Sequence, residues 1–142
     1  MIQKTLIILK PDCVKKNIVG EVLDRFQKKS LSIVGAKMIF LTDAILEKHY
    51  AHMLTSIYYP GLKEFMQSGP VIVCVLQGED CIKVARAMLG STDSTKAEKG
   101  TIRGDYGTST TVNVVHASDS PESAEKEISL FFTTEEIFNY AK

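Results

Sequence analysis

The sequence has 142 residues, and its 17 lysines and arginines balance its 17 aspartates and glutamates, so the formal net charge is zero. This length predicts one domain, residues 1–142, with a substantial buried core. Zero net charge argues against a protein that binds nucleic acid or an anionic membrane through bulk electrostatic attraction.

The first strand is predicted over residues 5–9, an apolar run too short for a membrane span or for the core of a secretion signal. Lys10 follows, before a proline that cannot continue a strand, and is placed to point into a cleft; a solvated lysine is the alternative. Residues 20–29 predict a helix with one apolar face. A second strand is predicted over residues 31–41, with a bend near Gly35.

The next segment predicts two helices separated by a break. Thr42 offers a side-chain cap for a helix over residues 43–54, which carries Tyr50. A break rich in aromatic residues follows over residues 57–61, and a short helix over residues 62–67.

Residues 71–76 form an unbroken apolar run, which is typical of a central strand. A helix over residues 79–89 begins with two acidic residues, which favour the positive end of a helix dipole. Residues 91–107 have no periodicity and predict a long loop, and such loops are more often functional than idle. The cations and hydroxyls of this loop are Lys96, Lys99, Arg103, Thr92, Ser94 and Thr101.

A fourth strand is predicted over residues 110–115, and His116 follows directly at its end. The next helix, residues 121–132, is capped by Ser120 and has a proline at its first position. Glu127 lies beside the apolar face of this helix. A partly buried acid needs a partner, which is either an imidazole or a lysine or arginine.

A last helix is predicted from Thr134. Four strands interleaved with helices predict an α/β sandwich of the split βαβ-βαβ type. A doubly wound parallel sheet needs more strands than the pattern provides.

The cysteines and histidines show no metal-binding spacing. Cys13, Cys74 and Cys81 form no C-x-x-C pair, and an odd number without a secretion signal predicts reduced thiols in the cytoplasm. His49 and His52 are three residues apart, and we expect them on a solvated helix face.

No P-loop, dinucleotide-binding or nucleophile-elbow motif occurs in the sequence. His116 is the one convincing nucleophile, although a lone histidine near apolar residues is more often a packed or surface residue. Other side chains suit a polyphosphate bound by cations and hydroxyls rather than by a glycine loop: Lys10, Tyr50, Arg86, Thr92 and Arg103. The residues by themselves therefore predict a cytoplasmic α/β domain that handles phosphate groups.

Residues 113–119, Asn-Val-Val-His-Ala-Ser-Asp, resemble the active-site signature of nucleoside diphosphate kinases, N-x-x-H-G/A-S-D. Other segments match that family in the same order and cover nearly the whole chain: residues 5–12, 19–21, 49–50, 68–71, 88–92, 100–105 and 122–128. One such motif is weak evidence, but several in register are strong.

The resemblance implies a ferredoxin-like βαββαβ fold with a four-stranded antiparallel sheet covered by helices. It implies ping-pong transfer of the γ-phosphoryl group from a nucleoside triphosphate such as ATP to a nucleoside diphosphate, which maintains NTP and dNTP pools. The Mg²⁺ cofactor would be bound mainly through the nucleotide phosphates rather than by protein ligands.

By position, the resemblance implies that His116 is the phosphorylated nucleophile. Glu127 would hydrogen-bond the other ring nitrogen, and Ser118 would support that carboxylate. Tyr50 and Lys10 would lie close to the transferred group.

The nucleotide-binding residues follow in the same way. Arg86, Arg103 and Thr92 would bind the phosphates, and Lys10 with Asn113 would reach the sugar hydroxyl.

The chain departs from the family pattern in several places. Residues 56–59 read Ser-Ile-Tyr-Tyr instead of Arg-Pro-Phe-Phe, so Tyr58 takes the position of the phenylalanine that stacks on the base and keeps an aromatic face. Asp93 and Ser94 replace Asn-Pro, and Lys99 replaces a proline. Both changes are expected to loosen the long loop.

The resemblance also implies homotetramers or homohexamers built from dimers, with nucleotides as the other partners. Two other kinds of protein are alternatives to the enzyme. A non-catalytic nucleotide-binding relative is expected to lack His116, Lys10 or an arginine, all of which this chain keeps. A nucleic-acid-binding ferredoxin-like module is expected to have a basic face and an RNP1-like stretch, and neither is seen in the sequence.

Overall fold

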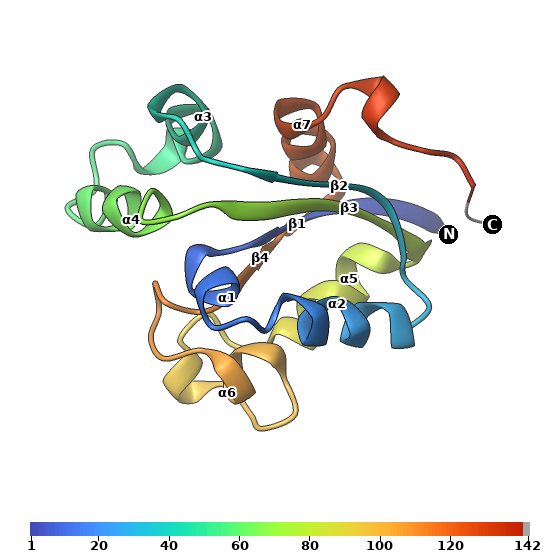
Figure 1. Cartoon of the computed structure of the whole chain (residues 1–142), viewed down its shortest axis with the longest axis horizontal. Helices are drawn as coiled ribbons and strands as arrows, with labels where there is room; N and C mark the ends of the chain where they lie inside the picture. Colours follow the sequence, from blue (N-terminus) through green and yellow to red (C-terminus); the bar gives the residue numbers. More distant parts are fainter. Residues whose placement is uncertain (141–142) are drawn as a thin grey trace.

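The computed structural model describes residues 1–140, and its centre is a four-stranded antiparallel sheet in the order β2-β3-β1-β4 (Figure 1). The strands are β1 (Ile2–Leu9), β2 (Ser32–Ile39), β3 (Val71–Glu79) and β4 (Val115–Ala117). This order and the helices between the strands confirm the ferredoxin-like prediction. The central position predicted for β3 is also confirmed, because β3 pairs with both β1 and β2.

Helices cover the sheet. The α-helices are α1 (Pro11–Lys15), α2 (Val19–Lys28), α3 (Asp43–His49), α4 (Tyr59–Met66), α5 (Cys81–Leu89), α6 (Ile102–Tyr106) and α7 (Pro121–Phe131). The 3₁₀ turns are η1 (Ala51–Met53), η2 (Ser94–Lys96) and η3 (Thr134–Glu136). Within the described residues, no helix has the length and apolar character needed to cross a membrane.

The side chains of β1 alternate between two hydrophobic cores. Ile7 and Leu9 pack with buried residues of α2 and α5, whereas Leu6 and Ile8 pack with buried residues of α3, α4 and α7. Figure 1 shows α2 and α5 on one side of the sheet and α3 and α7 on the other. Because both faces are covered, the strand reads as a continuous apolar run in the sequence.

Local signals in the sequence act as predicted at three places. The Thr42 side chain accepts a hydrogen bond from the Ile45 N–H and caps α3, and Ser120 caps α7 in the same way. The predicted bend of the second strand is a register shift between Ile33 and Gly35.

The predicted strand over residues 110–115 is wrong, because β4 begins only at the last of these residues and contains His116 within it. The amide of Asn113 donates to two backbone carbonyls outside the sheet, and Val114 has a φ of 78°. A positive φ is incompatible with an extended strand, so tertiary contacts outweigh the β-propensity of this run.

The helix boundaries around the aromatic segment also differ from the prediction. The predicted break at residues 57–61 overlaps α4, which begins at Tyr59 and carries Pro60 in its first turn, where a helical N–H has no partner. The predicted helix over residues 43–54 ends at His49, and η1 follows it.

Two short helices were not predicted. Helix α1 begins directly after Lys10, and α6 lies within the segment 91–107, which the sequence predicts as a loop. Strand β3 extends to Glu79, so α5 begins at Cys81 rather than at residue 79. Helices of five residues are too short to show a hydrophobic period, so periodicity does not reveal α1 and α6.

Candidate active site

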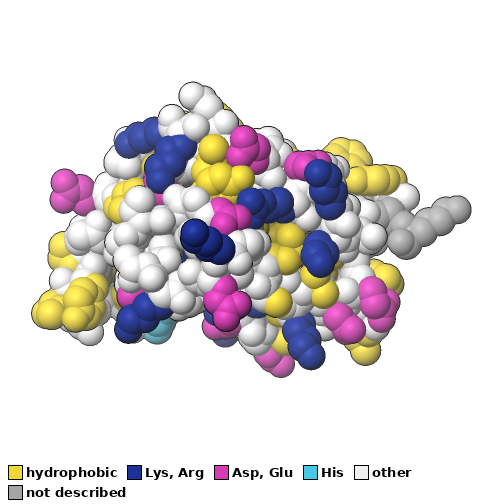
Figure 2. All heavy atoms as spheres, turned by 90° about the horizontal axis from the view of Figure 1, so that it is seen from below, with side chains coloured by type: hydrophobic (Ala, Val, Ile, Leu, Met, Phe, Trp, Pro, Cys, Tyr) yellow, Lys and Arg dark blue, Asp and Glu magenta, His cyan; other side chains and the backbone are white. Residues whose placement is uncertain are grey.

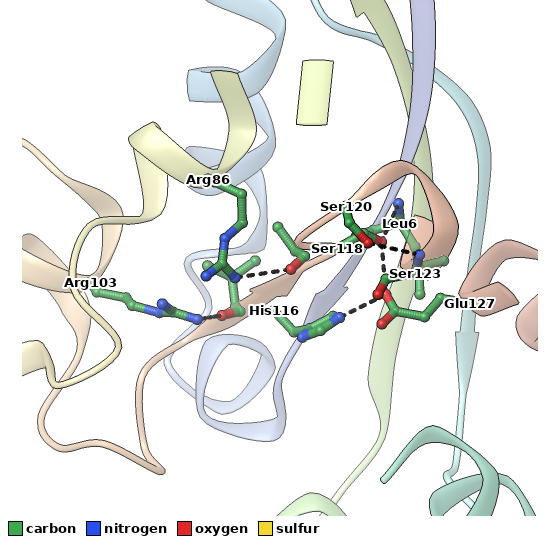
Figure 3. Close-up of polar contacts among 10 residues, drawn as sticks. Leu6, Arg86, Arg103, His116, Ser118, Ser120, Ser123 and Glu127 are labelled. Carbon is green, nitrogen blue, oxygen red and sulfur yellow. Dashed lines mark hydrogen bonds and ion pairs between the residues drawn. The ribbon is translucent and has the colours of Figure 1, made fainter. Parts of the chain in front are cut away.

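His116 lies on the short edge strand β4, opposite Ile8 of β1, and is half-buried. Its Nε2 atom is 2.9 Å from Oε1 of Glu127, which projects from α7 (Figure 3). The Ser118 hydroxyl donates to the same carboxylate oxygen at 2.7 Å, and the Leu6 backbone N–H donates to the Ser118 Oγ at 3.3 Å. The predicted contacts of Glu127 with the imidazole and with Ser118 are therefore present.

This arrangement selects one tautomer of the neutral imidazole. Burial raises the pKa of Glu127, but the hydrogen bond and charge of His116 and the hydrogen bond from Ser118 more than offset it, so the pKa is lowered overall. An ionised carboxylate only accepts hydrogen bonds, so Nε2 of His116 carries the hydrogen. The lone pair of the neutral ring is then on Nδ1.

Two arginines flank His116 through the backbone of β4. Arg103 Nη2 donates to the Val115 carbonyl at 2.8 Å, and Arg86 Nη1 donates to the Ala117 carbonyl at 3.2 Å (Figure 3). Burial and the nearby charge of Arg86 lower the pKa of Arg103 to about 10, so it is still a cation at neutral pH. Both guanidinium groups thus place positive charge beside the imidazole.

Lys10 adds a third cation. It is buried, and its Nζ donates to Oδ1 of Asn113 at 2.7 Å. The Asn113 amide donates to the carbonyls of Thr92 at 3.0 Å and Thr110 at 2.8 Å, which fixes its orientation. Burial, and then the charge of Arg103, lower the pKa of Lys10 to about 8. A desolvated ammonium of this kind is stabilised by an anionic ligand.

A single cavity of about 1390 Å³ joins these groups. Every residue predicted for the site lines it except Ser118, which lies behind Glu127: the lining residues from the prediction are Lys10, Tyr50, Tyr58, Arg86, Thr92, Arg103, Asn113, His116 and Glu127. Predicted residues from five regions of the chain therefore meet at one place.

Two tyrosines form the aromatic part of the cavity wall. Tyr50 is the C-terminal cap of α3 and not one of its helical residues, and burial raises the pKa of its phenol, which is neutral at pH 7. Tyr58 has 73% of its surface exposed, so its ring is accessible to a ligand. Tyr50 is thus partly buried and Tyr58 exposed in the wall of the same cavity.

The prediction of a solvated helix face for His49 is wrong. Its ring packs edge-on against the ring of His116, with centroids 4.8 Å apart and an interplanar angle of 85°. The centroid of the His49 ring also lies 4.5 Å from that of the Tyr50 ring and 5.6 Å from that of the Phe131 ring. Burial is the main cause that lowers the pKa of His49 to about 4. The spacing from His52 carries no signal of a contact made across the fold, and the available signal was that His49 stands in residues 49–50, a segment that resembles the family.

Two aspartates near the site were also missed. Asp12 is buried, and its Oδ2 accepts a hydrogen bond from the Val114 N–H at 3.1 Å. Asp119 lines the cavity, and hydrogen bonding by Ser123 is the largest cause that lowers its pKa. Both aspartates stand inside the segments that resemble the family motifs, which was the available signal.

Known proteins match nearly the whole chain, and they belong to one family. The family model described as nucleoside diphosphate kinase matches residues 3–137. A nucleoside diphosphate kinase of Parabacteroides distasonis is 49% identical over 138 residues, which are 97% of this chain and 90% of that protein.

Solved structures agree with this match. The Aquifex aeolicus nucleoside diphosphate kinase superposes with a TM-score of 0.93 at 42% identity, covering 97% of this chain and 100% of that one. The halophilic nucleoside diphosphate kinase of Halobacterium salinarum, solved in complex with CDP, has a TM-score of 0.96 at 34% identity and covers 100% and 95% of the two chains. The chain belongs to the nucleoside diphosphate kinase family, and it is a phosphotransferase that acts between nucleoside triphosphates and diphosphates.

Proposed function

We propose that His116 carries the phosphoryl group between the two nucleotides. In the first half-reaction, the Nδ1 lone pair attacks the γ-phosphorus of a nucleoside triphosphate such as ATP. The bond from phosphorus to the β,γ-bridging oxygen breaks, and the diphosphate leaves with that electron pair. In the second half-reaction, the terminal oxygen of another diphosphate attacks the phosphohistidine, and Nδ1 recovers its lone pair. The observation that carries this proposal is the chain of hydrogen bonds from His116 to Glu127 to Ser118.

Glu127 has the role of a positioning and charge-stabilising residue. When Nδ1 forms its bond to phosphorus, the ring becomes cationic, and the carboxylate at 2.9 Å from Nε2 stabilises that charge. The Ser118 hydroxyl, which also donates at 2.7 Å to this carboxylate, keeps it oriented.

The cations of the cavity bind the phosphates and stabilise the charge that develops during transfer. Arg86 and Arg103 lie beside the nucleophile and present planar donors that suit phosphate oxygens, and the Thr92 hydroxyl lies in the same wall. Tyr50, a neutral phenol, supplies a donor close to the transferred group.

The nucleoside part is bound by a second set of residues in the cavity. The Lys10–Asn113 pair at 2.7 Å offers a cation and an amide to the ribose hydroxyl and to the phosphate beside it. The exposed Tyr58 ring stacks on the base, and because every base has a π-face, such a contact admits several nucleotides.

Mg²⁺ fits this donor set as an ion that arrives with the nucleotide. The carboxylates in the cavity wall are Asp119 and Glu127, and Glu127 is engaged with His116. Asp119 is thus the residue that would contact the hydrated ion, and the phosphates would be its main ligands. When bound, the ion neutralises phosphate charge and aligns the γ-phosphoryl group.

Residues 1–142 form, in this proposal, a single domain that works in the cytoplasm as a homotetramer or homohexamer built from dimers. Strand β2 is an edge strand of the sheet and exposes Met38 (58%), and Phe40 directly after the strand is also exposed (57%), which favours association at this edge. All three cysteines are free and buried, in keeping with a reducing compartment. Light scattering of the purified protein measures the assembly.

The decisive experiment uses ATP labelled in the γ-phosphate together with Mg²⁺. The protein is expected to acquire an acid-labile, base-stable label that GDP removes. His116→Ala should acquire none, whereas His52→Ala, an exposed histidine outside the hydrogen-bond chain, should label normally. Label that persists in His116→Ala would disprove the assignment of the nucleophile.

The same experiment distinguishes the alternatives. A non-catalytic nucleotide-binding protein would bind ATP without becoming labelled. A nucleic-acid-binding module is disfavoured further by the face seen in Figure 2, where lysines and arginines are interspersed with aspartates and glutamates instead of forming a continuous basic surface.

A further inference from the structure

Three potential metal ligands converge in the wall of the cavity. His49, His116 and Glu127 each offer one ligand atom, and these atoms all lie within 4.8 Å of one another. They come from the end of α3, from β4 and from α7, so the cluster exists only in the folded chain.

The spacing of the two imidazoles suits one tetrahedral ion. With Zn–N distances near 2.0 Å, two imidazoles on one zinc ion place their ring centres roughly 5 Å apart. The rings of His49 and His116 are 4.8 Å apart and nearly perpendicular. His116 Nε2 and Glu127 Oε1 are 2.9 Å apart, close to the roughly 3.3 Å that separates neighbouring ligands in a tetrahedral zinc site.

His49 has spare ligand capacity. Its Nδ1 atom is buried and makes no hydrogen bond to any described residue. An unpartnered buried ring nitrogen is costly, and no hydrogen bond from a described residue competes with a metal ion for this ring. His49 also ends α3, so its side chain can adjust without breaking a helical turn.

We propose that a zinc ion binds between His49, His116 and Glu127, with water as the fourth ligand, and reversibly blocks phosphoryl transfer. The block rests on the proposed role of His116, whereas the binding does not. The spacing places the ion at Nε2 of His116, where it replaces the hydrogen. The neutral ring then carries its hydrogen on Nδ1 and has no lone pair for attack.

The donor set distinguishes zinc from magnesium. Two imidazole nitrogens and one carboxylate are a common zinc ligand set, while magnesium prefers oxygen ligands in an octahedron. The inhibitory ion and the Mg²⁺–nucleotide therefore use different atoms of the same cavity.

Binding is tested first, without any substrate. Chelator-stripped full-length protein is titrated with Zn²⁺ against a chromophoric chelator. One ion per chain is expected, and His49→Phe should weaken the affinity at least about 10-fold. Phenylalanine keeps the ring that packs on Tyr50 and Phe131, and His49→Gln provides a second variant. His52→Phe, the same change at an exposed histidine of the same cavity wall that is not one of the three ligands, should bind zinc as the wild type does.

Inhibition is tested second, with phosphoryl transfer from excess Mg²⁺–ATP measured at increasing Zn²⁺. Each variant is compared with its own rate without zinc. The inhibition midpoint should move to at least about 10-fold higher zinc in His49→Phe and His49→Gln, and stay unchanged in His52→Phe. Equal zinc affinity in wild type and both His49 variants would overturn the site, as would a midpoint that does not move. Because the binding titration needs no catalysis, failure of the phosphohistidine assignment would leave that result intact.

Discussion

The backbone N–H of Val114 donates a hydrogen bond to Oδ2 of Asp12, at 3.1 Å. Val114 has a φ of 78°, and the Val115 N–H donates to the Asn113 carbonyl at 2.9 Å, so these residues form a strained γ-turn. A β-branched residue in this conformation costs on the order of 1–3 kcal/mol. The turn directs Asn113 toward Lys10 and precedes the strand that carries His116.

Asp12→Ala is expected to destabilise the protein by about 1–3 kcal/mol, because it leaves the buried Val114 N–H without an acceptor. Phosphoryl transfer should slow at the same time, since the turn then relaxes and moves Asn113. Urea unfolding and steady-state kinetics measure the two effects. Asp12→Asn keeps an acceptor oxygen and should lose less; an Asp12→Ala protein as stable as the wild type would contradict the role of this bond.

Glu127→Gln is expected to lower kcat by about 10²- to 10⁴-fold, because a neutral amide does not stabilise the ring cation formed during transfer. Ser118→Ala removes only the support of the carboxylate at 2.7 Å and should cost less. Tyr50→Phe should also leave slower but measurable transfer. Single-turnover labelling of His116 separates the chemical step from nucleotide binding. Unchanged labelling rates in Glu127→Gln would remove its assigned role.

The ionisation of Glu127 is expected to make the free energy of unfolding depend on pH. Its folded-state pKa lies below the ordinary value of 4.5 despite burial, because His116 and Ser118 favour the ionised form. A lowered carboxyl pKa contributes stability that is complete above pH 4.5 and is lost as the pH falls through the folded-state pKa. Glu127→Gln should therefore flatten the acid limb of the unfolding free energy. An acid limb identical to that of the wild type would contradict this contribution.

Nucleotide affinity is expected to fall as the pH rises through about 8, because this is the pKa of Lys10 and its ammonium then becomes neutral. Isothermal titration of a nucleoside diphosphate between pH 7 and pH 9.5 measures it. Lys10→Arg keeps its charge over this range and should lack the pH-dependent loss. If both proteins lose affinity alike, another group is responsible.

The same lysine is expected to reduce stability at neutral pH. Its pKa is about 8 in the folded protein against 10.5 ordinarily, so charged Lys10 destabilises the fold fully below pH 8, and this cost disappears as the pH rises from 8 to 10.5. Lys10→Met should therefore raise the free energy of unfolding at pH 7, on the order of 1–3 kcal/mol, while weakening nucleotide binding. Chemical unfolding at pH 7 checks the sign.

Arg25 connects α2 to the helix that carries Arg103. Its Nη2 is 2.7 Å from Oδ2 of Asp105, and its guanidinium lies 4.8 Å from the Tyr106 ring centre. Asp105→Asn should raise the KM for nucleotide a few-fold with a smaller effect on kcat, because α6 then moves; the stability cost of this partly exposed pair is only about 0.5–1 kcal/mol.

A matched control exists on the surface of α2. Asp24 pairs with Lys28 at 2.9 Å in an exposed position away from the cavity. Asp24→Asn removes the same kind of charge and should leave KM unchanged. Equal effects of Asp24→Asn and Asp105→Asn on KM would show that the Arg25 pair has no special connection to Arg103.

The fold could be predicted where local chemistry and tertiary packing agree. The apolar runs of β1 and β3, and the caps Thr42 and Ser120, lie where the sequence indicates, because both faces of the sheet are covered and a cap needs only its own first turn. The prediction failed at residues 110–115, where a β-branched run forms a strained turn held by contacts distant in sequence.

The candidate site shows the same difference between what local sequence signals predict and what depends on tertiary contacts. For the site, the family motifs predicted which side chains carry the chemistry, because His116, Glu127 and the arginines stand in segments that need particular residue types. The tertiary structure was needed to show that His49 packs on His116, that Asp12 accepts a hydrogen bond from Val114, and that one cavity joins these segments. The physical reason is that a motif records which groups are needed, whereas burial, contact and tautomer depend on which distant segments the fold places beside them.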